Sequence, residues 1–198
     1  MIALNEFVST HNYLVHIVPY TADIFVFTYP LYLVALYVYG IVHRSLYHKE
    51  AWLAIFLAAW VAALINWVIK HFWDKMRPES AIENTDFLIL EHLPTNPFPS
   101  DHAGVSAAIA MCTLLLARKH RDPLFVYSAV YFWIASITMA VSRVAVAVHW
   151  PTDVIVWVWV WIVAWWLVIC PSCRQWHKRV IITPLIRLEE WITRRMFP

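Results

Sequence analysis

The sequence predicts an all-α integral-membrane protein: one domain, residues 1–198, built as a polytopic bundle of about five transmembrane helices. Hydrophobic residues make up 62% of the chain and charged residues only 14%. Soluble domains are about half apolar, so this excess indicates that a lipid bilayer surrounds the protein. The apolar residues also gather in runs close to the roughly 20 residues that a helix needs to cross about 30 Å of hydrocarbon. No linker or internal repeat divides the chain.

Five apolar runs define the predicted transmembrane helices: roughly 21–43, 51–72, 103–117, 123–142 and 152–170. Pro30 interrupts the first run, which membrane helices tolerate better than soluble helices do. The third run is short, but it extends to Asp101 if its polar start lies at the membrane interface.

The two ends of the chain predict helices on the membrane surface. Segment 1–20 has neither the basic start nor the small-residue cleavage site of a signal peptide. Its imperfect apolar period predicts an N-terminal amphipathic helix lying along the interface. Segment 174–198 sets apolar residues among six basic ones. This pattern predicts a cytoplasmic amphipathic helix after Pro184, held by anionic lipid headgroups.

The basic residues predict the orientation of the bundle. With five spans, the loops 43–50 and 117–123 and the tail after residue 171 share one side. That side carries eleven of the fifteen Lys and Arg residues: Arg44, Lys49, Arg118, Lys119, Arg121, Arg174, Lys178, Arg179, Arg187, Arg194 and Arg195. The Lys/Arg bias of short loops marks the cytoplasmic face. The other face, which includes loop 79–97, is therefore expected to be periplasmic or extracellular.

Three short segments at that predicted outer face carry the chemistry. They are Lys70-x6-Arg77-Pro78, Phe98-Pro99-Ser100-Asp101-His102 and Ser142-Arg143-x5-His149-Trp150-Pro151-Thr152-Asp153. Together they supply two histidines, a carboxylate four residues after one of them, and three fixed cations. Such a set contains what is needed to bind and break a phosphate ester without a metal ion.

The two histidines fit complementary roles. Asp153 follows His149 by four residues, and Pro151 between them suits the first position of a helix. The carboxylate can fix the proton on one ring nitrogen and leave the other free to attack phosphorus. We expect His149 to be exposed at the interface. His102 lies in the first turn of a predicted helix, where it can give a proton to a leaving group. Taken singly, each segment also fits a capped helix end without function.

The remaining residues of the three segments suit anion binding. Ser100 is a good N-cap, and the free N–H groups of a helix start bind anions. Asp101 next to it suits the first turn through the helix dipole, or tunes the protonation of His102. Long cations at span ends commonly extend toward the interface without further function, and Lys75 is a second basic candidate that spacing does not exclude. The predicted phosphate-binding set is Lys70, Arg77, Ser100 and Arg143.

These motifs resemble the signature of the type 2 phosphatidic acid phosphatase superfamily: Lys-x6-Arg-Pro, Pro-Ser-Gly-His and Ser-Arg-x5-His-x3-Asp. The order and the internal spacings agree, and the resemblance covers about residues 66–157. The one departure is Asp101, where glycine is the commonest residue of the superfamily. The version Pro-Ser-Asp-His is similar to the bacterial undecaprenyl-diphosphate phosphatase branch, which also has small members with five or six spans.

The resemblance implies a metal-independent phosphatase of the bacterial cytoplasmic membrane. It implies hydrolysis of the terminal phosphate of undecaprenyl diphosphate at the outer face, in the recycling of a lipid carrier for peptidoglycan and cell-envelope synthesis. His149 would attack phosphorus to give a phosphohistidine, with Asp153 orienting the ring. His102 would protonate the leaving group and then activate water, while the cations hold the phosphate oxygens.

Other substrates and functions remain open from the residues. Lipid A 1-phosphate, phosphatidylglycerophosphate and phosphatidate would suit the same chemistry. A transporter would place ionisable groups in mid-span, whereas these groups lie near span ends. A vanadium haloperoxidase shares the constellation, but a five-span membrane protein fits that class poorly.

The expected partners are a lipid phosphate or diphosphate and the bilayer. The net charge of +2 gives no reason to expect nucleic acid, and no carboxylate cluster suits Mg²⁺, so no cofactor or metal is expected. Cys170 and Cys173 have CxxC spacing but lack further ligands, which favours no function for the pair.

Overall fold

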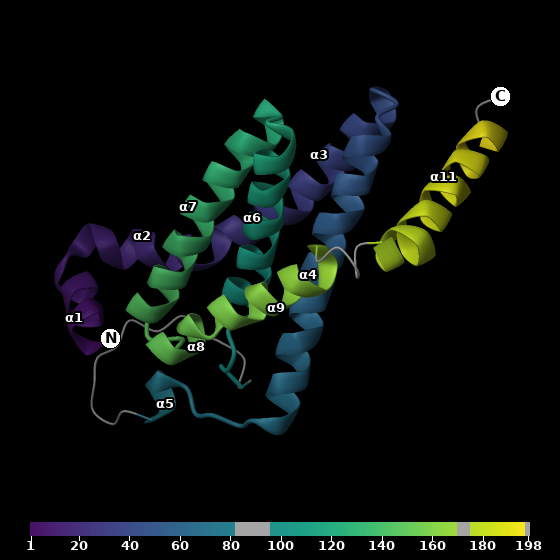
Figure 1. Ribbon diagram of the computed structural model, residues 1–198. Coiled ribbons are helices and arrows are strands. Elements are labelled where there is room, and N and C mark those ends of the chain that lie inside the picture. Colours follow the sequence, from purple (N-terminus) through teal and green to yellow (C-terminus); the bar gives the residue numbers. More distant parts are fainter. Residues whose placement is uncertain (82–95, 170–174, 197–198) are drawn as a thin grey trace.

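The computed structural model describes residues 1–81, 96–169 and 175–196, and every regular element in these ranges is helical (Figure 1). The elements are α1 (Ile2–Thr10), α2 (Asn12–Asp23), the 3-10 helix η1 (Ile24–Phe27), α3 (Thr28–Val42), α4 (Leu46–Phe72), α5 (Pro78–Ala81), α6 (Asp101–His120), α7 (Pro123–Ala145), α8 (Pro151–Ile155), α9 (Trp157–Ile169), the π-helix η2 (Lys178–Ile182) and α11 (Thr183–Met196).

Helix α6 forms the centre of the bundle, packed between α4 and α7. Its buried face consists largely of small residues: Ala103, Gly104, Ser106, Ala107, Ala108 and Ala110. Small side chains let the neighbouring helices approach closely, as membrane helix interfaces commonly do. Larger side chains from the neighbours, including Ile55 of α4 and Phe132 and Met139 of α7, complete the core. The outward faces of α3, α4 and α7 are apolar and exposed, as expected for surfaces that meet lipid.

Among the residues that the structure describes, three helical segments are long and apolar enough to cross a membrane: Asn12–Val42, Leu46–Phe72 and Pro123–Ala145. They match three of the predicted spans in position. The other two predicted spans coincide with α6 and with α8 followed by α9. Helix α6 has 20 residues, of which five are alanine and ten are buried against protein. Helix α9 is strongly apolar but only 13 residues long.

The N-terminal segment differs from the single interfacial helix that its sequence predicts. The backbone is extended at His11, which separates α1 from α2, and α2 continues through η1 into α3. Figure 1 shows α1 and α2 beside the end of α7. The Asn5 side-chain amide donates to the Ala145 carbonyl oxygen at 2.8 Å in a buried contact. Pro30 falls in the first turn of α3, where its missing N–H costs no helical hydrogen bond.

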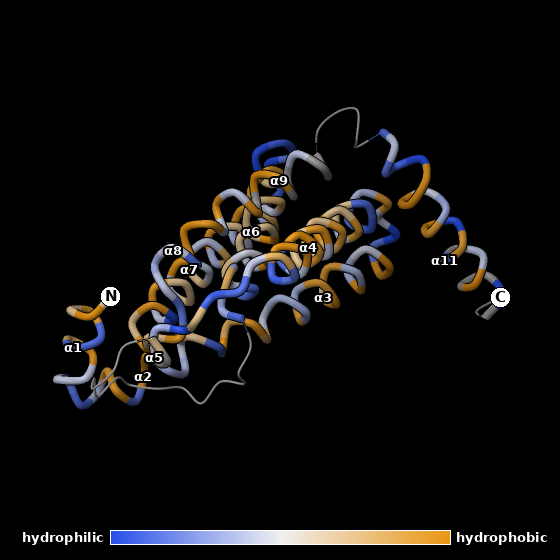
Figure 2. Tube along the Cα trace, turned by 90° about the horizontal axis from the view of Figure 1, so that it is seen from below, coloured by the Kyte–Doolittle hydropathy of each residue, from blue (hydrophilic) through white to orange (hydrophobic). Residues whose placement is uncertain are grey.

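The predicted C-terminal helix is present as α11, with Pro184 at its second residue. Figure 2 shows hydrophobic and hydrophilic residues alternating along it. Ile182 and Ile186 pack on Leu53 of α4. An ion pair between Lys49 and Glu189, 2.7 Å long, adds a second contact with α4. The tail is therefore docked at the end of α4 where the chain enters that helix. Cys170 and Cys173 lie outside the described residues.

Candidate active site

The three predicted motifs meet at one end of the bundle. This end holds the last turn of α4, the first turn of α6, the last turn of α7 and the short helix α8 (Figure 1). A backbone bond from Ser100 N to the Asp153 carbonyl oxygen, 3.3 Å long, joins the second motif to the third. Arg77 joins the first to the third through a 3.0 Å bond from its guanidinium to the Val148 carbonyl oxygen.

A tight turn after α7 brings His149 back over Arg143. The amides of Val148 and His149 both donate to the Arg143 carbonyl oxygen, at 3.2 and 3.3 Å. Ala147 takes a positive φ of 58° inside this turn. That conformation is unfavourable for a residue with a Cβ, by about 1–2 kcal/mol, so the surrounding packing must hold it. The turn explains how a spacing of six residues places an imidazole beside a guanidinium.

The two nitrogens of His149 face different groups. Nε2 lies 3.2 Å from a terminal nitrogen of Arg143, and Nδ1 lies 3.8 Å from a carboxylate oxygen of Asp153. A guanidinium can only donate, so Nε2 must be the acceptor and the proton of the neutral ring must be on Nδ1. Within the described residues Nδ1 makes no hydrogen bond, because 3.8 Å is too long for one. The lone pair of the ring is thus on the nitrogen that faces the cation and accepts from it.

Burial governs the charge of this ring. His149 is 4% exposed, so the expectation of an exposed interfacial side chain is wrong. Burial lowers the pKa of the His149 imidazole below its ordinary 6.5, the Asp153 carboxylate opposes this shift, and the nearby Arg143 charge adds to it. The ring is neutral at pH 7, as a nucleophile must be.

Asp153 is held rigidly behind His149. It is fully buried in the first turn of α8, which begins at Pro151 as predicted. Its carboxylate accepts a 2.9 Å bond from the Trp150 amide and forms an ion pair with Lys75. Lys75 also donates to the Thr152 hydroxyl at 2.8 Å. The first motif therefore reaches the third through Lys75 as well as through Arg77.

The second motif forms the start of α6 as its sequence predicts. Ser100 is the N-cap, and its hydroxyl accepts from the Ala103 amide at 3.5 Å. Asp101 in the first turn pairs with Lys70 and accepts a 3.2 Å bond from the Asn66 amide. Lys70, a predicted phosphate ligand, thus has a carboxylate partner. His102 follows, about one third exposed, at the edge of the site.

Arg143 is the most enclosed cation of the site, with 2% exposure. Its Nε donates to the Ala22 carbonyl oxygen at 3.3 Å, and one terminal nitrogen pairs with the Asp23 carboxylate. The same Asp23 oxygen lies 3.7 Å from Nε2 of His102. The structure therefore brings all eight predicted site residues to one end of the bundle. It also places the end of the N-terminal helix α2 next to them, through the contacts of Ala22 and Asp23 with Arg143.

Sequence reasoning missed three polar residues of this end. Asp23 lies far upstream of the motifs and inside a predicted span. Asn66 is fully buried one turn before Lys70, and that i, i+4 spacing was a usable signal. Asn96 bonds to the Trp73 carbonyl oxygen and accepts from the Phe98 amide at 3.0 Å, which holds the loop before α6. Asn96 lies in the predicted loop 79–97, which contains none of the three motifs, so nothing in the sequence pointed to it.

An apolar groove of about 400 Å³ begins at Asp101 and His102. It runs between α3, α4 and α6 and is lined by apolar side chains that include Tyr29, Leu33, Trp60, Val105 and Ile109. Trp60 is exposed on the outer face of the bundle. The groove therefore connects the polar site with the surface that meets lipid.

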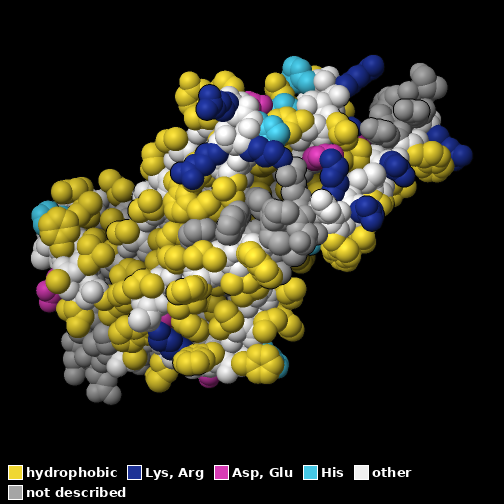
Figure 3. Space-filling view, in the orientation of Figure 1, with side chains coloured by type: hydrophobic (Ala, Val, Ile, Leu, Met, Phe, Trp, Pro, Cys, Tyr) yellow, Lys and Arg dark blue, Asp and Glu magenta, His cyan; other side chains and the backbone are white. Residues whose placement is uncertain are grey.

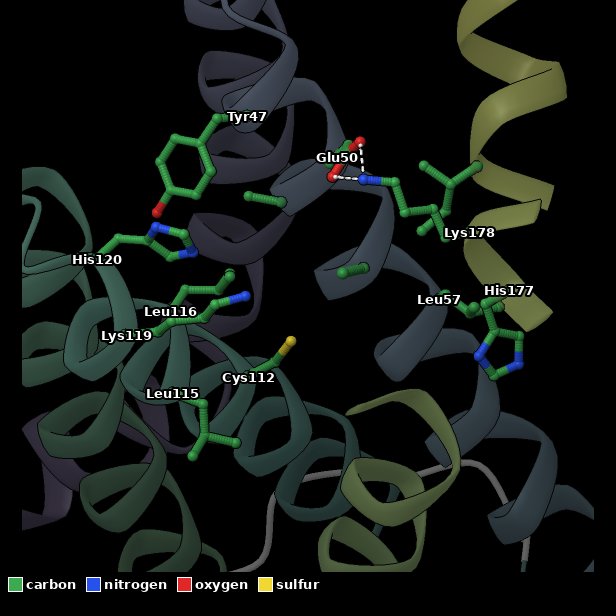
Figure 4. Close-up of a pocket in the computed structure, with 13 residues that line it drawn as sticks. Tyr47, Glu50, Leu57, Cys112, Leu115, Leu116, Lys119, His120, His177 and Lys178 are labelled. Atoms are coloured by element: carbon green, nitrogen blue, oxygen red, sulfur yellow. Dashed lines mark hydrogen bonds and ion pairs between the residues drawn. The ribbon is translucent and has the colours of Figure 1, made fainter. Parts of the chain in front are cut away.

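A second cavity, of about 130 Å³, lies at the other end of α4 and α6 (Figure 4). Cys112 and leucines form one part of it, and Lys119, His120 and His177 another. Glu50 and Lys178 form an ion pair of 2.7 Å across its edge. None of the predicted site residues lines it. Over the ranges that the structure describes, no group of three or more His, Cys, Asp or Glu side chains is arranged to hold a metal ion.

Two curated relatives are similar to this chain in sequence. YbjG of Escherichia coli strain K12, which carries an undecaprenyl-diphosphatase name, is 28% identical over 126 residues, covering 64% of this chain and 57% of that protein. A Sulfolobus acidocaldarius protein named undecaprenyl-diphosphatase is 34% identical over 100 residues, covering 48% of this chain and 42% of that protein. The chain thus spans about half the length of the curated relatives it matches.

The fold is similar to that of LpxE from Aquifex aeolicus, known from its crystal structure. The TM-score is 0.59 at 20% identity, over 82% of this chain and 90% of that one. Residues 49–176 match the PAP2 superfamily, and this stretch contains all three motifs. The expected resemblance is confirmed: the chain belongs to the PAP2 superfamily, the type 2 phosphatidic acid phosphatases.

Proposed function

We propose that this protein is a lipid phosphatase that removes the terminal phosphate of a polyprenyl diphosphate through a phosphohistidine intermediate on His149. The observation that carries the proposal is the orientation of the His149 ring. Its unprotonated nitrogen lies 3.2 Å from Arg143, while the protonated nitrogen faces Asp153. A phosphoryl group held by Arg143 would therefore meet a neutral nucleophile whose proton points away from it.

The reaction follows from these roles in two steps. Nε2 of His149 attacks the terminal phosphorus, an N–P bond forms, and the P–O bond to the polyprenyl monophosphate breaks as His102 gives it a proton. A water molecule then attacks the phosphohistidine, gives its proton to His102, and releases inorganic phosphate. The charge that redistributes over the phosphoryl oxygens is held by Arg143, Arg77 and Lys70, with Ser100 and the first N–H groups of α6. Fixed cations supply this stabilisation, so no divalent metal is required.

The apolar groove supports a lipid substrate. A phosphate bound between His102 and Arg143 would leave its lipid tail at the head of the groove, whose walls come from α3, α4 and α6. The tail could then reach the bilayer without crossing the polar site. The names of the two relatives and the sequence Pro-Ser-Asp-His support undecaprenyl diphosphate within this class.

The charge distribution supports an outward-facing site with five spans. Figure 3 shows Lys and Arg gathered over the ends of the bundle helices that lie away from the motifs, and over α11. Under the positive-inside rule this end is cytoplasmic. Helix α6 and the α8–α9 pair would then be the third and fifth spans. The enzyme would act at the periplasmic or extracellular face of a bacterial cytoplasmic membrane and recycle a lipid carrier for the cell envelope.

A panel of lipid phosphates tests this proposal. Purified protein is expected to release phosphate from undecaprenyl diphosphate more efficiently than from phosphatidate, phosphatidylglycerophosphate or lipid A 1-phosphate. Excess chelator should leave the rate unchanged, and vanadate should inhibit, because it adopts the five-coordinate geometry of the transition state. Preference for another lipid would reject the polyprenyl assignment alone. Release from none of them would reject the phosphatase.

A further inference from the structure

An aspartate outside the stretch that matches the superfamily reaches into the active site. Asp23 ends α2, whereas the match begins at residue 49. One oxygen of its carboxylate pairs with Arg143 and lies 3.7 Å from Nε2 of His102. It is thus shared between the residue proposed to hold the phosphoryl group and the residue proposed to move the proton.

The chain holds Asp23 in place through several contacts around it. The Thr21 hydroxyl hydrogen-bonds to the Ser142 hydroxyl at 2.8 Å. Ala22 is fully buried against Val146 and Val148 in the turn that carries His149. The Ala22 carbonyl oxygen accepts from Nε of Arg143 at 3.3 Å. Each of these contacts joins α2 to the third motif.

Because Arg143 is buried, its ion pair with Asp23 should matter more than an ion pair between two exposed side chains. Arg143 is 2% exposed, whereas the Asp23 side chain is 40% exposed. Asp23 thus gives the enclosed guanidinium a carboxylate partner that itself stays in contact with water. A fork held at Nε by Ala22 and at one terminal nitrogen by Asp23 leaves the other terminal nitrogen pointing to His149.

We propose that Asp23 is a positioning residue of the active site: it fixes the guanidinium of Arg143, and His102 lies next to this pair. The N-terminal helix pair α1–α2 then completes a catalytic centre whose motifs all lie downstream. This inference rests on the proposed phosphohistidine chemistry, but not on which lipid carries the phosphate.

Four variants test the role: Asp23→Asn, Asp23→Glu, Asp23→Ala and, as a matched control, Asp74→Asn. Asp74 is an exposed carboxylate in the loop that follows α4 at the same end of the bundle. Each variant is assayed for kcat, KM and vanadate inhibition on a short-chain polyprenyl diphosphate and on a short-chain phosphatidate. Thermal unfolding in detergent reports the fold.

Asp23→Asn is expected to lower kcat by about 10- to 100-fold, the size expected from a small misplacement of catalytic groups, and to leave KM within about threefold. Vanadate should bind more weakly, because it depends on the same Arg143 fork. Asp23→Glu should recover part of kcat, and Asp74→Asn should match wild type. Asparagine fills the volume of aspartate, so Asp23→Asn decides the matter even if Asp23→Ala fails to fold.

Two other results for kcat and vanadate inhibition would overturn the proposal. If Asp23 only blocks the empty site as a competing anion, Asp23→Asn will bind vanadate more tightly and keep its kcat. If Asp23 is only structural, Asp23→Asn will lose kcat in proportion to its thermal stability, with unchanged vanadate inhibition and no recovery in Asp23→Glu. Because both substrates are assayed, a lipid preference that contradicts the proposed function leaves this comparison intact.

Discussion

At the scale of the residue, three cations of the site are paired with carboxylates. Arg143 pairs with Asp23, Lys70 with Asp101 and Lys75 with Asp153. A phosphate dianion must therefore share or replace these partners when it binds. Lys70 and Asp101 are partly exposed, so their pair contributes at most about 1 kcal/mol and can be exchanged at little cost.

The pH dependence follows from the buried His149 ring. Burial lowers the pKa of this ring below 6.5, so the proposed nucleophile is neutral above that lowered pKa and protonated below it. As pH rises through this pKa, activity should rise. The acid limb of kcat/KM is therefore expected below pH 6.5. A limb centred at or above 6.5 in a pH titration of kcat/KM would contradict this assignment.

The exposed pairing of Asp101 predicts a mild effect of its removal. Asp101→Gly releases Lys70 and leaves the Ser100 cap in place. We expect an active enzyme whose diphosphate-to-monophosphate preference shifts by less than about tenfold, or about 1.4 kcal/mol. Wild-type and variant kcat/KM on the two substrate types give the shift. Loss of turnover in Asp101→Gly would show that the carboxylate is essential.

At the scale of the element, α6 fits tightly against α4 where the site is built. A Cβ added to Gly104 would come within 2.8 Å of the Asn66 amide nitrogen, and under 3.0 Å something must shift. Asn66 is fully buried and bonds to the Ser100 carbonyl oxygen and to Asp101. The absence of a side chain at Gly104 thus lets Asn66 support the start of α6.

Gly104→Ala is expected to destabilise the protein by about 1–3 kcal/mol through overpacking, despite the better helix propensity of alanine. Thermal unfolding in detergent measures the loss. The Asn66→Ala substitution removes the atoms with which the new Cβ would clash. Gly104→Ala should therefore cost less stability in the Asn66→Ala background than in the wild-type protein. Equal costs in both backgrounds would mean that the close approach does not matter.

Element by element, the sequence predicted best what local rules control. Ser100 as the cap of α6, Pro151 as the start of α8 and the helix around Pro184 follow from capping and proline preferences, and all are found. The docking of α1 and α2 on α7 depends on contacts between residues far apart in the sequence, such as Asn5 with Ala145 and Thr21 with Ser142. No local sequence pattern reveals those contacts, so the sequence could not predict that Asp23 reaches the site.

At the scale of the whole molecule, the two ends of the bundle differ in kind. One end holds the eight predicted site residues. The other holds the basic loops and the docked tail, and Figure 3 shows Lys and Arg gathered there. A protein of this polarity should sit in one orientation in the membrane, because the basic loops resist transfer across it.

Impermeant thiol labelling tests this orientation. Cysteines are introduced singly at exposed Asp74 and exposed Arg118, in a background that lacks Cys112, Cys170 and Cys173. In intact cells the cysteine at position 74 should react, and that at position 118 should react only after the membrane is permeabilised. The reverse pattern would place the active site in the cytoplasm.

The central claim is that His149 carries the phosphoryl group, and trapping that group tests it most directly. Polyprenyl diphosphate labelled in its terminal phosphate is mixed with enzyme and quenched within one turnover. We expect a base-stable, acid-labile phosphoenzyme in wild type, and more of it in His102→Ala, because water activation is then slow while the phosphomonoester still leaves readily. His149→Gln, which fills most of the buried space of the ring, should give none and should not turn over. Full activity or an undiminished phosphoenzyme in His149→Gln would contradict the account.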